Sequence, residues 1–317
     1  MISPLHIAGH GWISGLGRGA AAYAHFLTGL PPHREALGDS LRHKFEKCTP
    51  APGWDADIRK QPRLRRSSRI SHFACLAALD ACEMAGISPS VPAMAVVMTV
   101  SSGGVNYTRR FFHGVLTDGP AAASPLLFPE TVYNAPASHI ASLLGIDAPA
   151  YTLTGDGAVG FAGIELASDL LATGEAERVL LIGAEECDPV LCEGYAAWRC
   201  LHDAQSTELV GMPGEGAAAV VLESGAVGLE IAALSRGKTF QNRAEAILAS
   251  AAVRDEISLS HPTDRVVAES TWGECLGASV LLRLVLGCHE LSVPGTALLE
   301  ACGWSFEAGA AVLRRRV

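Results

Sequence analysis

A carboxylate at a sharp turn, Asp156 in Gly155-Asp156-Gly157, is the first candidate for chemistry in this sequence. The turn follows a short run at 151–154 that predicts a strand and precedes an apolar stretch at 158–172 that predicts a helix. An aspartate there can act as an acid or base, or it can accept the first N–H groups of the helix. We expect the second role, because Asp is among the residues preferred at helix starts.

Thiols and imidazoles are the next candidates, and their spacing argues against a metal. One stretch contains Cys187, Cys192, Cys200 and His202. This spacing matches no structural zinc pattern, so we predict core or loop thiols and no metal site. The nine cysteines, an odd number, are expected to be reduced and mostly buried.

Other familiar cofactor and nucleophile motifs are missing. Gly9-His10-Gly11 follows a predicted strand, but Ser14 stands where a dinucleotide fingerprint has its third glycine. No Gly-x-Ser-x-Gly elbow and no phosphate-binding loop occurs. We therefore expect no cofactor.

Composition favours a large layered protein that does not bind polyanions. The 317 residues are 49% hydrophobic and include 33 glycines, which suits helices packed closely on sheets. The net charge of −9 argues against general nucleic-acid or membrane-surface binding. The N-terminus does not look like a signal peptide, and no charge-free apolar run of about 18 residues predicts a membrane span. We expect a cytoplasmic protein.

Short glycine turns between apolar runs predict the elements that position Asp156. Buried strands are expected at 93–100, 179–183 and 217–223, and helices at 68–85, 107–116 and 134–144. This alternation is the α/β pattern. From Gly225 it restarts in compressed form, with strands at 229–234, 296–302 and 309–314 and a helix at 270–286. We therefore divide the chain at 1–225 and 226–317.

Four stretches carry a resemblance to a known family: FPETVYNAPASHI at 128–140, APAYTLT at 148–154, VLLIGAEE at 179–186 and GEGAAAVVLE at 214–223. In this order they resemble the N-terminal half of a β-ketoacyl synthase of the thiolase fold, and the last third resembles the family more weakly. The resemblance implies an α/β, thiolase-like layered αβαβα fold. It would have two pseudo-repeated halves, with the C-terminal half shortened.

The same resemblance shows which chemical groups this chain lacks. In the family, a cysteine thiolate at the strand-to-helix turn takes the acyl chain, and two histidines and a lysine support decarboxylation. Here Gly157 stands at the nucleophile position, and Glu269 and Glu274 stand at the positions of the lysine and second histidine. His261 is the nearest candidate for the other histidine, but its spacing is too short for a clean match. The resemblance implies that the chain alone catalyses no condensation.

Family members without the nucleophile include chain length factors, which pair with an active ketosynthase. The sequence is similar to the short subunits of this kind in aryl polyene systems. That implies a heterodimer acting on chains held by an acyl carrier protein. In this fold the strand before the turn pairs across a two-fold axis, which here is Tyr151, Thr152, Leu153 and Thr154.

Bulky side chains near that axis would end the acyl tunnel of the active subunit and cap the chain length. The candidates are Phe111, Phe112, Phe128 and Tyr133, and ordinary core packing is the alternative for each.

Two other functions stay open. The chain could be an enzyme of different thioester chemistry that uses Asp156, Glu274 or His261 as acid and base. It could also be a module that binds acyl carrier protein through the basic run RLRRSSR at 63–69.

Overall fold

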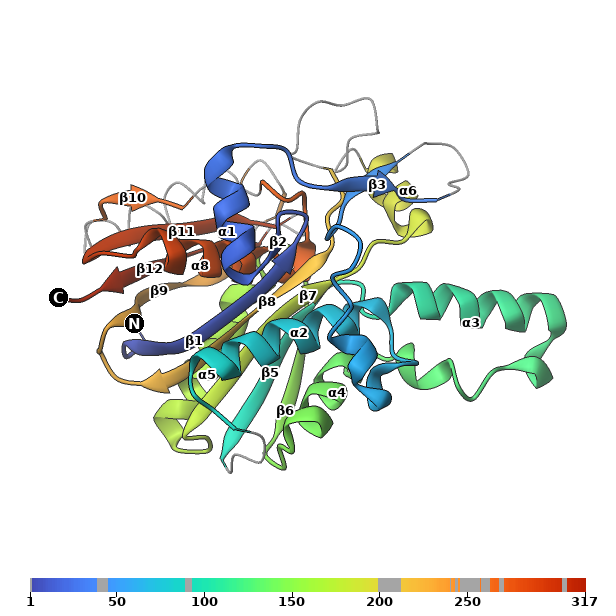
Figure 1. The fold of residues 1–317 in the computed structure, drawn as a ribbon, viewed down its shortest axis with the longest axis horizontal. Helices are drawn as coiled ribbons and strands as arrows, with labels where there is room; N and C mark the ends of the chain where they lie inside the picture. Colours follow the sequence, from blue (N-terminus) through green and yellow to red (C-terminus); the bar gives the residue numbers. More distant parts are fainter. Residues whose placement is uncertain are drawn as a thin grey trace.

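One long mixed sheet runs through the protein, in the strand order β10-β11-β12-β9-β1-β8-β7-β5-β6 (Figure 1). The structure is a computed structural model. It describes residues 2–38, 45–88, 93–198, 212–239, 241–242, 245, 257, 263–267, 271–303 and 307–317.

The N-terminal part of the sheet has the order β6-β5-β7-β8-β1. Its strands are β1 (Leu5–Ser14), β5 (Met94–Val100), β6 (Ala150–Thr154), β7 (Arg178–Glu185) and β8 (Gly216–Ser224). β5 is parallel to β6 and β7, whereas β8 is antiparallel to both β7 and β1. β5 and β7 are almost wholly buried, which explains their unbroken apolar sequences.

The C-terminal part repeats this arrangement with one strand fewer among the described residues. Its strands are β9 (Leu229–Thr239), β10 (Arg265–Val266), β11 (Gly295–Cys302) and β12 (Glu307–Arg315). Their order, β10-β11-β12-β9, matches β5-β7-β8-β1 in the first part, and the strand directions match too. The described part has no counterpart of β6.

Two helices between the two parts of the sheet carry the main core. They are α5 (Val159–Thr173) and α8 (Ser279–Glu290). α5 contacts β5, β7 and β9, and α8 contacts β8 and β11, so each touches both parts. Side chains such as Phe161, Ile164 and Leu281 are fully buried there. Each such burial contributes about 1.5–3 kcal/mol relative to exposure.

A second helical layer covers the other face of the N-terminal strands. It consists of α2 (Arg69–Met84) and α4 (Ala135–Leu144), which pack on each other, and α2 lies on β1 and β8. Gly9 and Gly11 make this contact possible: a Cβ on either would lie 2.2 or 2.4 Å from the carbonyl oxygens of Ala81 and Ala77. The Gly9-His10-Gly11 motif is therefore a packing motif.

An arm projects from this body (Figure 1). It comprises residues 105–133, which contain α3 (Val105–Asp118), η3 (Pro120–Ala122) and η4 (Phe128–Glu130). No residue of α3 is buried, and α3 packs mainly against η3 and η4.

The remaining elements are short. They are β2 (Gly17–Arg18), α1 (Gly19–Thr28), β3 (Arg34–Ala36), β4 (Glu46–Cys48), η1 (Ile58–Lys60), η2 (Pro62–Leu64), α6 (Pro189–Ala197) and η5 (Leu276–Ala278). α6 was not predicted from the sequence. The helix predicted at 270–286 is wrong at its start, because α8 begins only at Ser279, after Gly273 and Leu276 with positive φ angles of 82° and 36°. No helix among the described residues is long and apolar enough to cross a membrane.

Candidate functional site

The turn after β6 places Gly157 at the start of α5, between the two parts of the sheet. Gly157 is buried, and a Cβ there would lie 3.5 Å from Glu274 Oε1 and 4.0 Å from Gly303 Cα. These are ordinary contact distances, so the position has room for a small side chain.

Asp156 turns inward from the same turn. Its Oδ1 accepts a hydrogen bond from the N–H of Ala158 at 3.2 Å, one residue before α5 begins at Val159, so it braces the turn ahead of the helix. Only 8% of Asp156 is exposed, and its carboxylate presses on Gly303, where a Cβ would be 1.9 Å from Oδ1. Burial, together with the nearby Asp156 charge, raises the pKa of Glu307.

Glu274 reaches the turn from the other half of the chain. Its Oε1 accepts hydrogen bonds from the N–H of Leu276 at 2.9 Å and from Ser279 Oγ at 2.6 Å. The fold therefore brings Gly157, Asp156 and Glu274 together. His261 and Glu269 lie outside the described residues.

A further carboxyl group, Glu185 at the end of β7, lines the same small cavity as Glu274. It accepts hydrogen bonds from the N–H groups of Ser101 at 2.9 Å, Ser102 at 3.0 Å and Gly277 at 3.2 Å. Burial nevertheless raises its pKa to about 7. Sequence reasoning missed this residue, although VLLIGAEE at 179–186 contains it.

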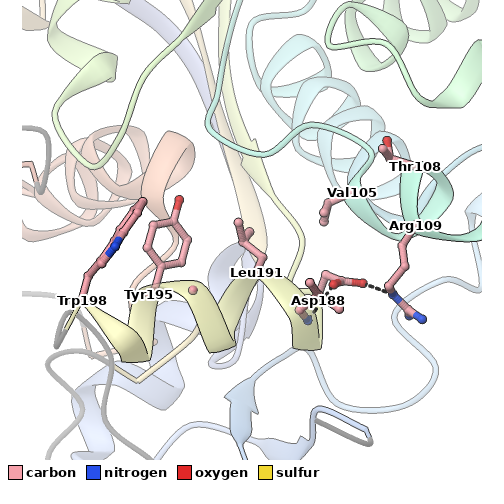
Figure 2. A pocket seen from close by; sticks show the side chains of 9 residues that line it. Val105, Thr108, Arg109, Asp188, Leu191, Tyr195 and Trp198 are labelled. Carbon is pink, nitrogen blue, oxygen red and sulfur yellow. Dashed lines mark hydrogen bonds and ion pairs between the residues drawn. The ribbon is translucent and has the colours of Figure 1, made fainter. Parts of the chain in front are cut away.

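An apolar groove of about 470 Å³ lies between α3 and α6 (Figure 2). Its walls are Val105, Thr108, Arg109, Asp188, Val190, Leu191, Gly194, Tyr195 and Trp198. Leu191 and Tyr195 also line a smaller inner cavity whose wall includes Glu185 and Glu274. The groove therefore adjoins the site around Gly157. Asp188-Pro189 was a signal for α6, because Asp188 caps the helix and Pro189 is its first residue.

The predicted tunnel residues lie on the arm, and none is among the groove-lining residues. Phe111 packs against Phe112 and Phe128, with ring centroids 5.8 and 5.7 Å apart. The core-packing alternative is wrong for Phe112, Phe128 and Tyr133, which are 56%, 55% and 50% exposed. Tyr133 lies against Gly103, where a Cβ would be 2.9 Å from its ring.

The strand predicted at the two-fold axis is the last strand of the described sheet. β6 pairs with β5, and the described residues provide no neighbour for its other edge. Tyr151, Thr152 and Leu153 are half-buried, and Thr154 is exposed.

The basic run at 63–69 is split between surface and interior. Arg63, Arg65 and Arg66 are exposed, and Arg63 donates to Ser142. Arg69 instead forms a 2.5 Å ion pair with the buried Glu215. Arg65 and Arg66 are thus the exposed arginines of the run without such a contact to Ser142.

Most thiols of the described residues are buried. Of the eight cysteines among them, seven are buried and Cys302 is half-buried. Burial raises the pKa of Cys275 well above its usual value, so little thiolate forms. Within the described ranges no three His, Cys, Asp or Glu side chains are placed to hold a metal ion. Cys200 and His202 lie outside those ranges.

Comparisons with known proteins agree with this fold. The model of the beta-ketoacyl synthase N-terminal domain matches residues 37–227. An ishigamide ketosynthase/chain length factor structure superposes with a TM-score of 0.81 at 18% identity, covering 99% of this chain and 100% of that chain.

Two further structures are comparably similar. A beta-ketoacyl synthase from Burkholderia phymatum STM815 has a TM-score of 0.79 at 16% identity, with both chains covered completely. A ketosynthase in complex with its chain length factor from Xenorhabdus doucetiae has a TM-score of 0.79 at 12% identity, covering 99% of this chain and 98% of that chain. The comparison with curated proteins gives no match. The structural matches confirm the predicted thiolase-like α/β fold.

Proposed function

Because this chain belongs to the beta-ketoacyl synthase family, we propose that it is the non-catalytic chain length factor of a heterodimer with an active ketosynthase. The observation that carries the proposal is Gly157, which stands at the start of α5 where the family's reaction needs a thiolate. A glycine cannot form the acyl thioester, so the covalent route is closed.

The groups around Gly157 do not compensate for the missing thiol. Glu274 points its carboxylate at the position where a side chain of residue 157 would begin. A carboxylate there cannot donate the hydrogen bonds that a developing oxyanion needs. Loss of even one supporting acid or base costs about 10²–10⁴-fold in rate.

The edge of β6 and the arm supply the surface that a partner would cover. An uncovered strand edge presents N–H and C=O groups that pair readily with another strand. Exposed apolar side chains lie on the adjoining arm, namely Phe112, Leu116, Leu126, Phe128, Val132 and Tyr133. Such a combination is typical of a large and permanent interface. Two of the similar structures are described as ketosynthases with chain length factors, which supports the same kind of partner.

Chain length would then be set where the partner's acyl tunnel meets this chain. The aromatic cluster of Phe111, Phe112 and Phe128 and the half-exposed Tyr133 lie on the arm. The groove between α3 and α6 extends from the same helix and could receive the end of the chain. We further propose that residues 1–225 and 226–317 form the two halves of the fold, and that the first half carries the partner surface.

Co-expression with a cysteine-bearing ketosynthase tests this function. We expect a one-to-one complex that elongates acyl chains on an acyl carrier protein, and no elongation by this chain alone. Native mass spectrometry gives the stoichiometry, and analysis of carrier-bound products gives activity. A stable monomer that binds none of the ketosynthases tested would contradict the proposal.

A different thioester chemistry is the second candidate, because Asp156 and Glu274 both border Gly157. Two carboxyl groups facing one position can serve as acid and base. The chain would be tested for thioester hydrolysis and malonyl decarboxylation beside Asp156→Asn and Glu274→Gln. Activity that both substitutions abolish would favour this candidate, and inactivity of all three proteins would remove it.

A further inference from the structure

The arm is attached to the body through the first turns of α3. The N–H of Asn106 donates to Glu186 Oε1 at 2.9 Å, and the Asn106 side chain donates to the Cys187 carbonyl at 3.0 Å. One turn further on, Arg109 Nε forms an ion pair with Asp188. Three successive residues after β7 thus hold the base of the arm.

Asp188 has two partners on two different elements. One carboxylate oxygen accepts the N–H of Val190 at 2.9 Å and caps α6, while the other pairs with Arg109 of α3. The Asp188 side chain is 1% exposed, whereas that of Arg109 is 48% exposed. The two walls of the groove are therefore joined by one ion pair whose acidic member is buried.

Figure 2 shows where this pair lies in the groove. Arg109 reaches from α3 to Asp188 at the first residues of α6, and Tyr195 and Trp198 lie at the opposite end of α6. Tyr195 also faces the inner cavity with Glu185 and Glu274. The groove thus shares Tyr195 with the small cavity beside Glu274, and the ion pair lies at the other end of α6.

We propose that the Arg109–Asp188 pair is a latch that fixes the spacing of α3 and α6 and thereby limits the length of acyl chain that the groove accepts. This inference rests on the proposed function for the identity of the occupant, an acyl chain.

The limit follows from the different free energies with which an acyl chain would fill the two ends of the groove. An acyl chain gains by covering the apolar side chains between α3 and α6. A chain long enough to reach Asp188 would have to separate its carboxylate from Arg109, and a buried charge without its partner is strongly unfavourable. Acyl chains should therefore bind more tightly with length until they meet the pair, and no more tightly beyond it.

The first test uses the full-length protein alone. Saturated fatty acids of 8 to 18 carbons would compete for the protein with the fluorescent polyene fatty acid cis-parinaric acid. For the wild type we expect the affinity to rise with length and then level off. Arg109→Ala should move that limit to longer acids and bind the longest ones about tenfold more tightly than the wild type.

Two further variants separate the latch from a general loss of structure. Asp188→Asn removes the charge but keeps a side chain that can cap α6, so it should shift the limit in the same direction. Arg109→Lys should retain most of the wild-type limit. Arg110→Ala is the matched control, because the neighbouring Arg110 lies over the Tyr107 ring and does not line the groove. An unchanged limit in Arg109→Ala, or an equal shift in Arg110→Ala, would overturn the latch.

The second test uses the heterodimer and separates the two proposals. With an active ketosynthase, Arg109→Ala should lengthen the carrier-bound products while leaving the stoichiometry of the complex unchanged. If no ketosynthase pairs with the chain, the proposed function fails while the fatty-acid competition still decides the latch. If the wild type binds no fatty acid, the latch proposal is wrong even where the heterodimer forms.

Discussion

At the scale of single residues, Gly157 is not required by the backbone. It has no positive φ, and a Cβ would meet its neighbours at ordinary distances. What opposes a nucleophile is the charge beside it. A thiolate about 4 Å from the Glu274 carboxylate would be destabilised by roughly 4 kcal/mol at an effective dielectric constant of 20. The N-terminus of α5 would stabilise the thiolate by only about 0.3–1 kcal/mol.

The substitution Gly157→Cys therefore should fold but not condense acyl chains. We expect the thiol introduced at position 157 to have a pKa above the ordinary value of about 8.5. The pH dependence of iodoacetamide alkylation measures this pKa. Adding Glu274→Gln should lower it by at least about one unit, since the like charge is removed. A thiol that alkylates fully at neutral pH in the single variant would contradict the argument.

His10 belongs to the Gly9-His10-Gly11 motif, whose glycines serve packing against α2. Its ring meets that of His289 edge-on at 4.7 Å, and His289 stacks on Tyr23 at 4.8 Å. Burial, with smaller effects of His289 and Arg315, lowers the pKa of His10 to about 4. Because the unfolded chain binds a proton near pH 6.5 and the folded chain does not, stability is lost as the pH falls from about 6.5 to 4.

Replacing His10 by Gln should reduce the loss of folding stability as the pH falls. Between pH 6.5 and 4 we expect the wild type to lose up to about 1.4 kcal/mol per pH unit more than His10→Gln. Urea denaturation across this range measures the free energy of unfolding of both proteins. Between pH 7.5 and 9 their difference should stay constant. Parallel curves from pH 6.5 to 4 would show that His10 does not carry the effect.

At the scale of elements, periodicity and end signals predicted most of the fold. The structure confirms the helices predicted at 68–85, 134–144 and 158–172 to within two residues. Gly145 and Gly174 end two of them in the left-handed conformation that favours glycine. α6 was missed because it has nine residues and no clear apolar face, and its position beside α3 depends on tertiary contacts. The groove could not be predicted for the same reason.

The edge of β6 gives a test at this scale. Val96 donates to the Pro149 carbonyl and Gly155 donates to the Val100 carbonyl, so by alternation the N–H of Thr152 points away from β5. Thr152→Pro should remove a hydrogen bond to the partner strand while leaving the β5 pairing intact.

We expect Thr152→Pro to weaken co-purification with the ketosynthase at least about tenfold, because a hydrogen bond is lost and the proline ring crowds the partner strand. Size-exclusion chromatography and titration of the two purified subunits measure this. Thr152→Val, which keeps the N–H, is the control. Equal binding by the proline variant would mean that β6 is not at the interface.

At the scale of the whole molecule, the sequence predicted the layers better than the functional surfaces. The motifs at 128–140 and 179–186 indicated the fold, and Gly157, Asp156 and Glu274 do meet as neighbours. The arm was predicted as a helix, yet its projection was not, because its apolar side chains look like core residues in a sequence. Only the packed structure shows that the body leaves them uncovered.

The exposed arginines at 63–66 offer a binding surface for a third protein, the acyl carrier protein. For the heterodimer proposed above, we predict that the exposed Arg65 and Arg66 contact an acidic surface of the acyl carrier protein. Arg65→Glu with Arg66→Glu should weaken carrier binding by about 1 kcal/mol per site, and the difference should shrink at high salt.

Isothermal titration of the heterodimer with carrier protein at two salt concentrations measures that change. Lys60→Glu is the control, because Asp57 already pairs with Lys60 at 2.9 Å. Unchanged affinity in the double variant would exclude this docking surface.

The position of β6 at one end of the sheet has a consequence for assembly. Two strands related by a two-fold axis satisfy each other's open edges, and neither then has an edge left to offer a third chain. The opposite end of the described sheet is β10, a strand of two residues, which is too short to template growth. Joining through β6 therefore yields a closed pair and not a growing fibre, whether the second member is a ketosynthase or another copy of this chain.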